Sequence, residues 1–167
     1  MAIISFEKIA GDFEETEVPD GFRNLNWSNF WAIDNVLLEE RIGNSNAIRT
    51  GKAAAFSFPE IIDRPVAHWT AAFQSPDRDD DFDLNNGYFT AFNANDLKVK
   101  VFGFDDGERV AKKVLLLDPV REFGQFGAQF DDIDEVRFVA KGGTDADPIG
   151  PLPLTQSFLV DDLFIDF

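Results

Sequence analysis

Hydrophobic and polar residues alternate along this chain in many short runs, and turn residues separate one run from the next. Alternation with a period of two is typical of β-strands, whereas a helical pattern is confined to residues 35–41. The expected strands cover residues 3–9, 25–33, 53–58, 68–73, 87–93, 97–104, 109–117, 135–140 and 158–167. Many short strands of this kind predict an all-β sandwich or barrel.

The clearest local element is a hairpin, in which an Asp-Asp-Gly turn at residues 105–107 joins two alternating runs. Asp-Gly between alternating runs is a strong signal for a tight turn. Lys98 and Lys100 fall on the face opposite Val99 and Val101, so one side of the hairpin is expected to contact solvent.

Composition supports packed sheets in a single domain covering residues 1–167. The chain has 19 Phe and 3 Trp but only 1 Met and 1 Tyr, which favours a core of aromatic rings between sheet faces. With 15 Lys and Arg against 31 Asp and Glu, the net charge of −16 repels phosphate backbones, so nucleic acid is not an expected partner. The absence of cysteine excludes disulfides, zinc–thiolate sites and thiol nucleophiles.

Cellular location is less constrained by the sequence. No run approaches the roughly 20 apolar residues of a membrane helix, so we expect no membrane insertion. Residues 1–7 lack the basic segment and long apolar run of a signal peptide. Two locations stay open: a secreted or cell-surface domain whose leader is absent from this chain, and the cytoplasm.

The segment 157–167 places two adjacent carboxylates, Asp161 and Asp162, in an otherwise apolar extended run. In a regular strand their side chains point to opposite faces, which directs one of them inward. A buried carboxylate is tolerated when it is paired, hydrogen-bonded or bound to a metal, so the pattern implies a structural Ca²⁺ or an Arg partner such as Arg23 or Arg137. A frayed chain end with both faces exposed is the alternative.

The acidic run at residues 77–83 does not fit a helix–loop–helix calcium site. Counted from Asp77, Phe82 occupies the position where the loop needs Gly, and Tyr88 occupies the position of the bidentate Glu. A solvated acidic loop is the favoured interpretation, and an irregular Ca²⁺ loop is the alternative.

Aromatic and amide side chains are interleaved in residues 19–31, a mixture that can bind sugars through ring stacking and hydrogen bonds. Alternation places Leu25, Trp27 and Trp31 on one face and Asn24, Asn26 and Phe30 on the other, and Trp27 is expected in the core. The candidate ligand-binding residues are Asn24, Asn26, Trp31, Trp69 and Tyr88.

Nothing in the sequence forms a clear catalytic constellation. His68 is the lone histidine and lacks a nucleophile motif beside it, so a structural role is favoured. Carboxylate pairs such as Glu39 and Glu40 could serve glycoside hydrolysis, but among 31 acids such pairs arise by chance. We therefore expect no enzymatic activity.

Several landmarks along the chain together resemble one known family. They are Phe6-Glu7, the turn at residues 18–22, residues 25–30, 82–84 and 88–92, the hairpin at 99–107, residues 130–138 and the closing residues 160–163. In this order they resemble the secreted bacterial and fungal jelly-roll domains that are similar to galactose-binding-like carbohydrate-binding modules. The resemblance implies a β-sandwich jelly roll of two antiparallel sheets. It also implies a structural Ca²⁺ shared by Glu7 and by Asp161 or Asp162.

The expected function is that of a non-catalytic carbohydrate-binding module or lectin-like domain whose partner is a polysaccharide or glycan. A structural or adhesive cell-surface domain that mediates protein contacts, including self-association, is the alternative. A glycoside hydrolase or polysaccharide lyase is a third and less favoured reading.

Overall fold

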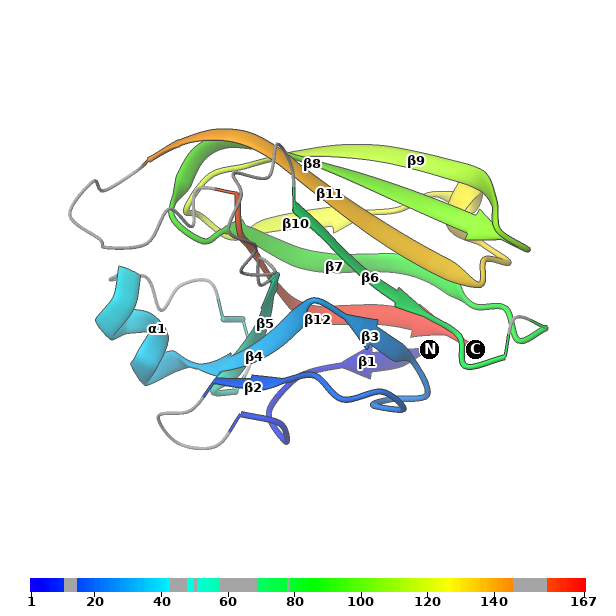
Figure 1. The fold of residues 1–167 in the computed structure, drawn as a ribbon, viewed down its shortest axis with the longest axis horizontal. Coiled ribbons are helices and arrows are strands. Elements are labelled where there is room, and N and C mark those ends of the chain that lie inside the picture. The colour runs from blue at the N-terminus through cyan, green and yellow to red at the C-terminus, as the bar shows by residue number, and fades with distance from the viewer. Residues whose placement is uncertain (11–14, 43–47, 50, 58–68, 78, 146–155) are drawn as a thin grey trace, which may run out of the picture.

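The computed structural model describes residues 1–10, 15–42, 48–49, 51–57, 69–77, 79–145 and 156–167. These residues form two antiparallel sheets that face each other (Figure 1). The seven-stranded sheet has the order β10 (Glu122–Gln125), β7 (Asp83–Ala91), β12 (Phe158–Asp166), β5 (Ala53–Ser57), β4 (Phe30–Asp34) and β2 (Glu15–Glu17), with β1 (Ala2–Ile4) paired to β12. The five-stranded sheet has the order β3 (Asn26–Ser28), β6 (Trp69–Gln74), β11 (Glu135–Asp145), β8 (Ala94–Asp105) and β9 (Glu108–Leu117). The expected all-β sandwich is confirmed.

Phenylalanine rings from both sheets meet in one core. Phe138 of β11 lies 5.9 Å from Phe30 of β4 and 5.4 Å from Phe158 of β12, measured between ring centroids. All three side chains are at most 1% exposed. Because burying an aromatic side chain removes a large apolar area from water, this contact between sheets is a main source of stability.

The predicted hairpin is present as β8 and β9, and its turn has the expected chemistry. Asp106 and Gly107 both have positive φ, 50° and 79°, as a two-residue hairpin turn of the common type requires. Val99 and Val101 are fully buried, whereas Lys98 is exposed on the other face. The solvated face of this hairpin is therefore the outer face of the five-stranded sheet.

The strand expected over residues 25–33 is instead divided at Asn29, and that prediction was wrong. Asn29 has a φ of 59°, a conformation that Asn tolerates better than most residues, and the chain passes there from β3 in one sheet to β4 in the other. The alternation is broken at this point, so Trp27 and Phe30 both face the core, with ring centroids 5.5 Å apart. Trp31 lies on the opposite face from Trp27, contrary to expectation.

The expected helix is α1 (Asn35–Ile42), and it covers part of the outer face of the seven-stranded sheet. The side chain of Asp34 accepts a hydrogen bond of 2.7 Å from the Leu37 N–H, which caps the helix start. Leu38 packs there into a second apolar cluster with Ile33 and Phe56, and Trp31 packs against that cluster.

Some elements were not expected from the sequence. β2 and β10 are short strands at sheet edges, and a 3-10 helix, η2 (Ala128–Phe130), precedes β11. His68 lies outside the described residues. Within the described part of the chain, no helix has the length and apolar character needed to cross a bilayer.

Candidate functional site

A groove of about 610 Å³ crosses the end of the five-stranded sheet where β3, β6 and β11 lie side by side. Its polar lining comes from the outward positions of these strands and from the turns beside them. The small side chain of Ala72 lies between Ser28 of β3 and Arg137 of β11 in the sheet register, so the floor is low between longer polar side chains. The groove is lined by Asp20, Asn26, Trp27, Ser28, Asn29, Thr70, Ala71, Ala72, Phe73, Gln74, Glu135 and Arg137.

The rim of the groove is held by side chains that bond to the backbone. The Asn29 side-chain amide donates to the Thr70 carbonyl at 3.0 Å, which joins the turn after β3 to β6. The Trp27 N–H donates to Oδ1 of Asp20 at 3.0 Å, and the Trp27 indole N–H donates to the Phe22 carbonyl at 2.9 Å. These bonds fix the positions of the two turns that border the groove.

A charged pair occupies the β11 side of the groove. Arg137 Nη2 donates to Oε2 of Glu135 at 2.8 Å, and a second, shorter bond joins Arg137 Nε to Oε1. The hydrogen bonds to Glu135 raise the pKa of Arg137, so this guanidinium is charged at any ordinary pH. The guanidinium also lies 4.2 Å above the ring of Phe104 on β8. Contacts on two sides thus hold Arg137 in one place.

Among the predicted ligand-binding residues whose side chains the structure describes, Asn26 alone lines this groove. Asn24 has a φ of 61° in the preceding turn and lines a different hollow, beside Asp79 and Asp81. Trp31 packs against the cluster under α1 on the other sheet. Trp69 begins β6, and its side chain lies outside what is described.

Tyr88 lies on the outer face of the seven-stranded sheet, where other side chains contact its ring. The guanidinium of Arg49 lies 4.3 Å above the ring centroid, and that of Arg121 lies 5.7 Å away. The ring of Phe123, which is 53% exposed, lies 5.1 Å from the ring of Tyr88. Of the two aromatic rings, Phe123 is the one that this surface presents to solvent.

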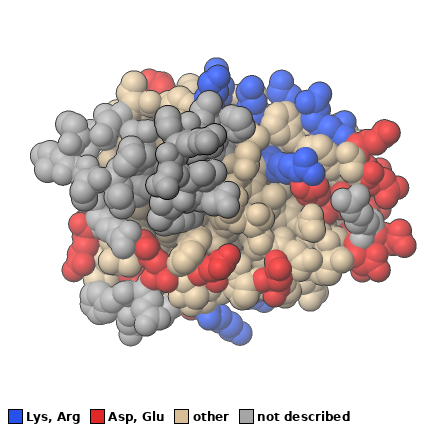
Figure 2. Space-filling model, viewed as in Figure 1, with Lys and Arg blue, Asp and Glu red and all other residues tan. Residues whose placement is uncertain are grey.

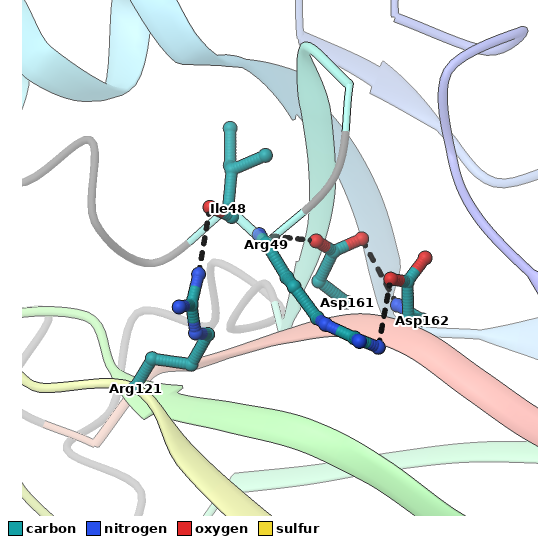
Figure 3. A network of polar contacts seen from close by, with 5 residues as sticks. All are labelled: Ile48, Arg49, Arg121, Asp161 and Asp162. Atoms are coloured by element: carbon teal, nitrogen blue, oxygen red, sulfur yellow. Dashed lines mark hydrogen bonds and ion pairs between the residues drawn. The ribbon is translucent and has the colours of Figure 1, made fainter.

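The adjacent carboxylates Asp161 and Asp162 are both buried, 1% and 3% exposed, and they share Arg49 (Figure 3). The Arg49 N–H donates to Oδ2 of Asp161 at 2.6 Å, and Nη1 of Arg49 lies 3.6 Å from Oδ2 of Asp162. Arg121 Nη1 donates to the Ile48 carbonyl at 3.1 Å, which ties the same segment to the sheet. Of the two expected alternatives, a calcium ion or an Arg partner, the structure shows an Arg beside Asp162, and this residue is Arg49 and neither Arg23 nor Arg137.

The expectation that the two carboxylates point to opposite faces was wrong because β12 has a bulge at this position. The register shifts between Asp161 and Phe164, and Asp162 has a φ of 46°. Two residues of β12 therefore lie opposite Gly87 of β7, which interrupts the alternation of side chains. Figure 3 shows both carboxylates turned toward Arg49.

Glu7 binds a different backbone segment from the two aspartates. Its Oε2 accepts the Lys52 N–H at 2.6 Å, and its Oε1 accepts the Ala53 N–H at 3.2 Å. N–H donors and Arg49 therefore occupy positions around these carboxylates where a cation would bind. Among the described residues, no group of three or more His, Asp or Glu side chains is arranged to hold a metal ion. The described donors around these carboxylates do not form a calcium cage, and the calcium site that the resemblance implies at Glu7, Asp161 and Asp162 stays an untested prediction.

Sequence reasoning missed Ser28, Gln74, Glu135 and Arg137 as lining residues of the groove. Alternation within residues 135–140 does place Glu135 and Arg137 on one face, so the sequence indicated that these two side chains lie together. Gln74 was missed because the expected strand ended at residue 73.

No family model and no curated protein matches the chain. Solved structures with a similar course of the chain include the carbohydrate-binding module TmCBM61 in complex with β-1,4-galactotriose, at 7% identity and a TM-score of 0.44, over 85% of this chain and 86% of that one. The K2 cleaved adhesin domain of Lys-gingipain is similar at 10% identity and a TM-score of 0.46, over 99% of both chains. The K3 cleaved adhesin domain of Lys-gingipain from Porphyromonas gingivalis w83 is similar at 14% identity and a TM-score of 0.36, over 83% of this chain and 91% of that one.

Proposed function

We propose that this β-sandwich is a non-catalytic glycan-binding domain whose ligand lies in the groove across β3, β6 and β11. The observation that carries the proposal is the convergence of amide, hydroxyl and charged side chains from three strands around one hollow of about 610 Å³. Such a concave surface with a few polar groups is the usual form of a small-molecule site.

The chemistry of the lining suits sugar hydroxyls. Each hydroxyl of a glycan both donates and accepts hydrogen bonds, and the amides of Asn26 and Gln74 offer both kinds of group. Ser28 adds a hydroxyl, which can take either role. Arg137 is already held by Glu135, so little side-chain entropy is lost when it binds a ligand oxygen.

Recognition in this groove depends on hydrogen bonds more than on aromatic stacking. Trp27 is only 7% exposed and Phe73 is fully buried, so the aromatic members of the lining present little ring surface. We therefore propose binding of moderate affinity. Of the two acids in the lining, Glu135 is bonded to Arg137, which supports a binding role over acid–base catalysis.

The proposal includes a secreted or cell-surface location, because that is where a glycan-binding domain meets polysaccharide. Detection of the native protein in culture medium or at the cell surface with an antibody tests this part of the proposal. Its recovery only from cytosol would contradict it.

Isothermal titration against a panel of neutral and anionic oligosaccharides tests binding itself. β-1,4-Galactotriose, the ligand in the TmCBM61 complex, serves as one neutral member of the panel. We expect the double variant Asn26→Ala and Gln74→Ala to lose binding, because it removes the two lining amides that lie opposite each other on β3 and β6. Asn95→Ala, which removes an exposed amide on β8 outside the groove, is the matched control. Absence of binding to every member of the panel would overturn the proposal.

An adhesive role through protein contacts is the second candidate, and a separate surface favours it. Phe123, which is 53% exposed, belongs to β10, an edge strand of the seven-stranded sheet, and Val120, which is 67% exposed, lies just before this strand. Exposed apolar side chains at a sheet edge favour contact with another chain. Sedimentation velocity over a range of concentrations, with Phe123→Ser as the variant, tests self-association through this edge.

A further inference from the structure

We infer that the ligand of the groove is an anionic polysaccharide, and that a row of lysines beside the groove binds its acidic groups. The row, called here the lysine track, consists of Lys141 of β11, Lys98 and Lys100 of β8 and Lys112 of β9. The inference rests on the proposed glycan-binding function and names the class of glycan.

Strand register brings the lysine track together on the outer face of the five-stranded sheet. Lys98 lies directly opposite Lys141, which places their Cβ atoms about 5 Å apart. Lys100 follows Lys98 on the same face. Lys112 is displaced by two residues from Val114, the partner of Lys100, and is a diagonal neighbour about 7–8 Å away. The four ammonium groups thus follow one line across three strands.

This concentration of positive charge contrasts with the rest of the molecule. The chain has a net charge of −16 and 15 Lys and Arg residues, yet Figure 2 shows Lys and Arg gathered along the edge where Figure 1 places β8, β9 and β11. Within the described residues, no ion pair or hydrogen bond joins a side chain of the lysine track to an acid. Like charges directly opposite each other destabilise a sheet, so the Lys98 and Lys141 pair costs stability that an anionic ligand would offset.

The acids nearest to the lysine track do not neutralise it. Glu135 lies on the same face but bonds to Arg137. Asp105, Asp106 and Glu108 lie at the hairpin turn, beyond the row in which Phe102 pairs with Lys112. At the other end of the track, Asp96 precedes Lys98 by two residues, and Oδ1 of Asp118 accepts the Asp96 N–H at 2.8 Å. Acids therefore flank both ends of the lysine track, but among the described residues none forms an ion pair with a lysine between Lys141 and Lys112.

The lysine track joins the groove through one row of the sheet. Phe102 has Arg137 as its partner on one side and Lys112 on the other, so the row runs from the groove wall to the end of the track. Val114 and Leu116, 47% and 54% exposed, offer apolar surface beside the lysines for the C–H faces of sugar rings. A polymer with hydroxyls and regular carboxylates fits both parts of this continuous face.

Other polyanions fit less well. Nucleic acid carries a charge on every phosphate, and the net charge of −16 repels it over most of the surface. The groove of amides and hydroxyls would also have no role in a contact made only through phosphates. A second copy of this chain could present its acids to the lysine track, and the experiment below includes that outcome.

Titration of oligomers of galacturonate, of a sulfated glucan and of a neutral glucan at low and moderate salt tests the inference. We expect the galacturonate oligomers to bind more tightly than the neutral glucan, and this preference to shrink as salt screens the charges. A stronger preference for the sulfated glucan would retain the anionic class and assign sulfate in place of carboxylate.

The double variant Lys98→Gln and Lys141→Gln is compared with Lys8→Gln and Lys52→Gln, which removes the same charge from exposed positions elsewhere. We expect the first to weaken galacturonate binding about fivefold to tenfold, the sum of two exposed charge contacts, and the second to change it little. Neutral glucan binding should be the same for both variants.

Three results would overturn the inference while separating it from the proposed function. Equal binding of neutral and anionic glycans would leave glycan binding intact and remove the anionic class. Equal effects of the two double variants would assign the preference to overall charge. Concentration-dependent dimerisation that the Lys98 and Lys141 variant abolishes, without glycan binding, would assign the lysine track to contact between copies of the chain.

Discussion

The backbone N–H of Arg49 donates to Oδ2 of Asp161 at 2.6 Å, although 112 residues separate the two in the sequence. Asp161, which accepts this bond, is 1% exposed, and the guanidinium of the same Arg49 pairs with Asp162. One residue thus supplies a hydrogen bond and a positive charge to a buried pair of acids. Such a pair is tolerated in the fold because backbone N–H groups bond to Asp161 and one guanidinium pairs with Asp162.

Replacement of Asp161 by Ala tests how much the fold depends on this bond. Because the change leaves the backbone N–H groups of Arg49 and Asp162 without their acceptor, we expect the free energy of unfolding to fall by about 2–4 kcal/mol. Urea denaturation followed by tryptophan fluorescence measures it. Asp80→Ala, at an exposed position, is the control and should change stability by about 0.5 kcal/mol or less. Equal effects of the two changes would contradict the role given to Asp161.

Calcium and Arg49 are competing explanations for the same carboxylates, and chelation distinguishes them. Because N–H donors and the Arg49 guanidinium surround Glu7, Asp161 and Asp162, we expect EDTA to leave the melting temperature unchanged. A ligand that binds only the folded state raises the melting temperature as its concentration rises. A fall with EDTA that excess Ca²⁺ reverses, and that Asp162→Asn abolishes, would establish the calcium site that the family resemblance implies.

Gly87 of β7 tests the packing around the bulge in β12. A Cβ at this position would lie 2.7 Å from Cδ2 of Leu163 and 3.3 Å from the ring of Phe89. We expect Gly87→Ala to lower the free energy of unfolding by about 1–3 kcal/mol, as overpacking of a core does. Gly127→Ala is the matched control, because a Cβ there meets no atom within 4 Å. Stability equal to that of the control would mean that Leu163 and Phe89 move aside freely.

The acidic end of the sandwich predicts a pH dependence of stability. Desolvation, and then the charges of Asp105, Asp132, Asp106 and Asp79, raise the pKa of Asp81 above its ordinary value of 3.8. An acid whose pKa is raised in the folded state binds more protons there than in the unfolded chain, so stability falls as the pH rises from 3.8 through the raised pKa.

Asp81→Asn removes that penalty. We expect the free energy of unfolding to increase at pH 7 by up to about 0.5 kcal/mol, the range of exposed positions, and the gain to vanish below pH 3.8. High salt should reduce the part of the gain that comes from the neighbouring acids. Denaturant titrations at several pH values measure it. Glu40→Gln, an exposed acid on α1, controls for the loss of one negative charge. A gain that is independent of pH would rule out titration of Asp81 as its cause.

Elements whose cause is local could be predicted from the sequence, and those that depend on distant neighbours could not. The hairpin of β8 and β9 follows from alternation around Asp106 and Gly107, which are adjacent in the chain. The crossover at Asn29 depends on one residue with a positive φ, which the hydrophobic pattern does not mark. The bulge at Asp162 also depends on one residue with a positive φ. Because the sequence does not reveal this bulge, Asp161 and Asp162 were wrongly expected to point to opposite faces of the sheet.

The lining of the groove could not be predicted from the sequence for a different reason. Asn26, Gln74 and Glu135 come from three separate segments and lie side by side only through the register of β3, β6 and β11. Asn26 was identified because amides and aromatic residues are interleaved near it. Gln74 lies outside the expected strand, and alternation indicates only the face on which Glu135 lies. The pairing of their strands is what relates both residues to Asn26.

The pairing of β1 with β12 brings the two ends of the chain together (Figure 1). Ala2 lies opposite Ile165, and the amino group of Met1 forms an ion pair with Asp166. A short peptide could therefore join the ends, and new ends could be opened in the tight turn at Asp106 and Gly107 without loss of a strand. Such a circularly permuted protein would keep every sheet pairing while the order of the strands along the chain changed. The sandwich owes its shape to how its strands meet, and the place where the polypeptide starts is interchangeable.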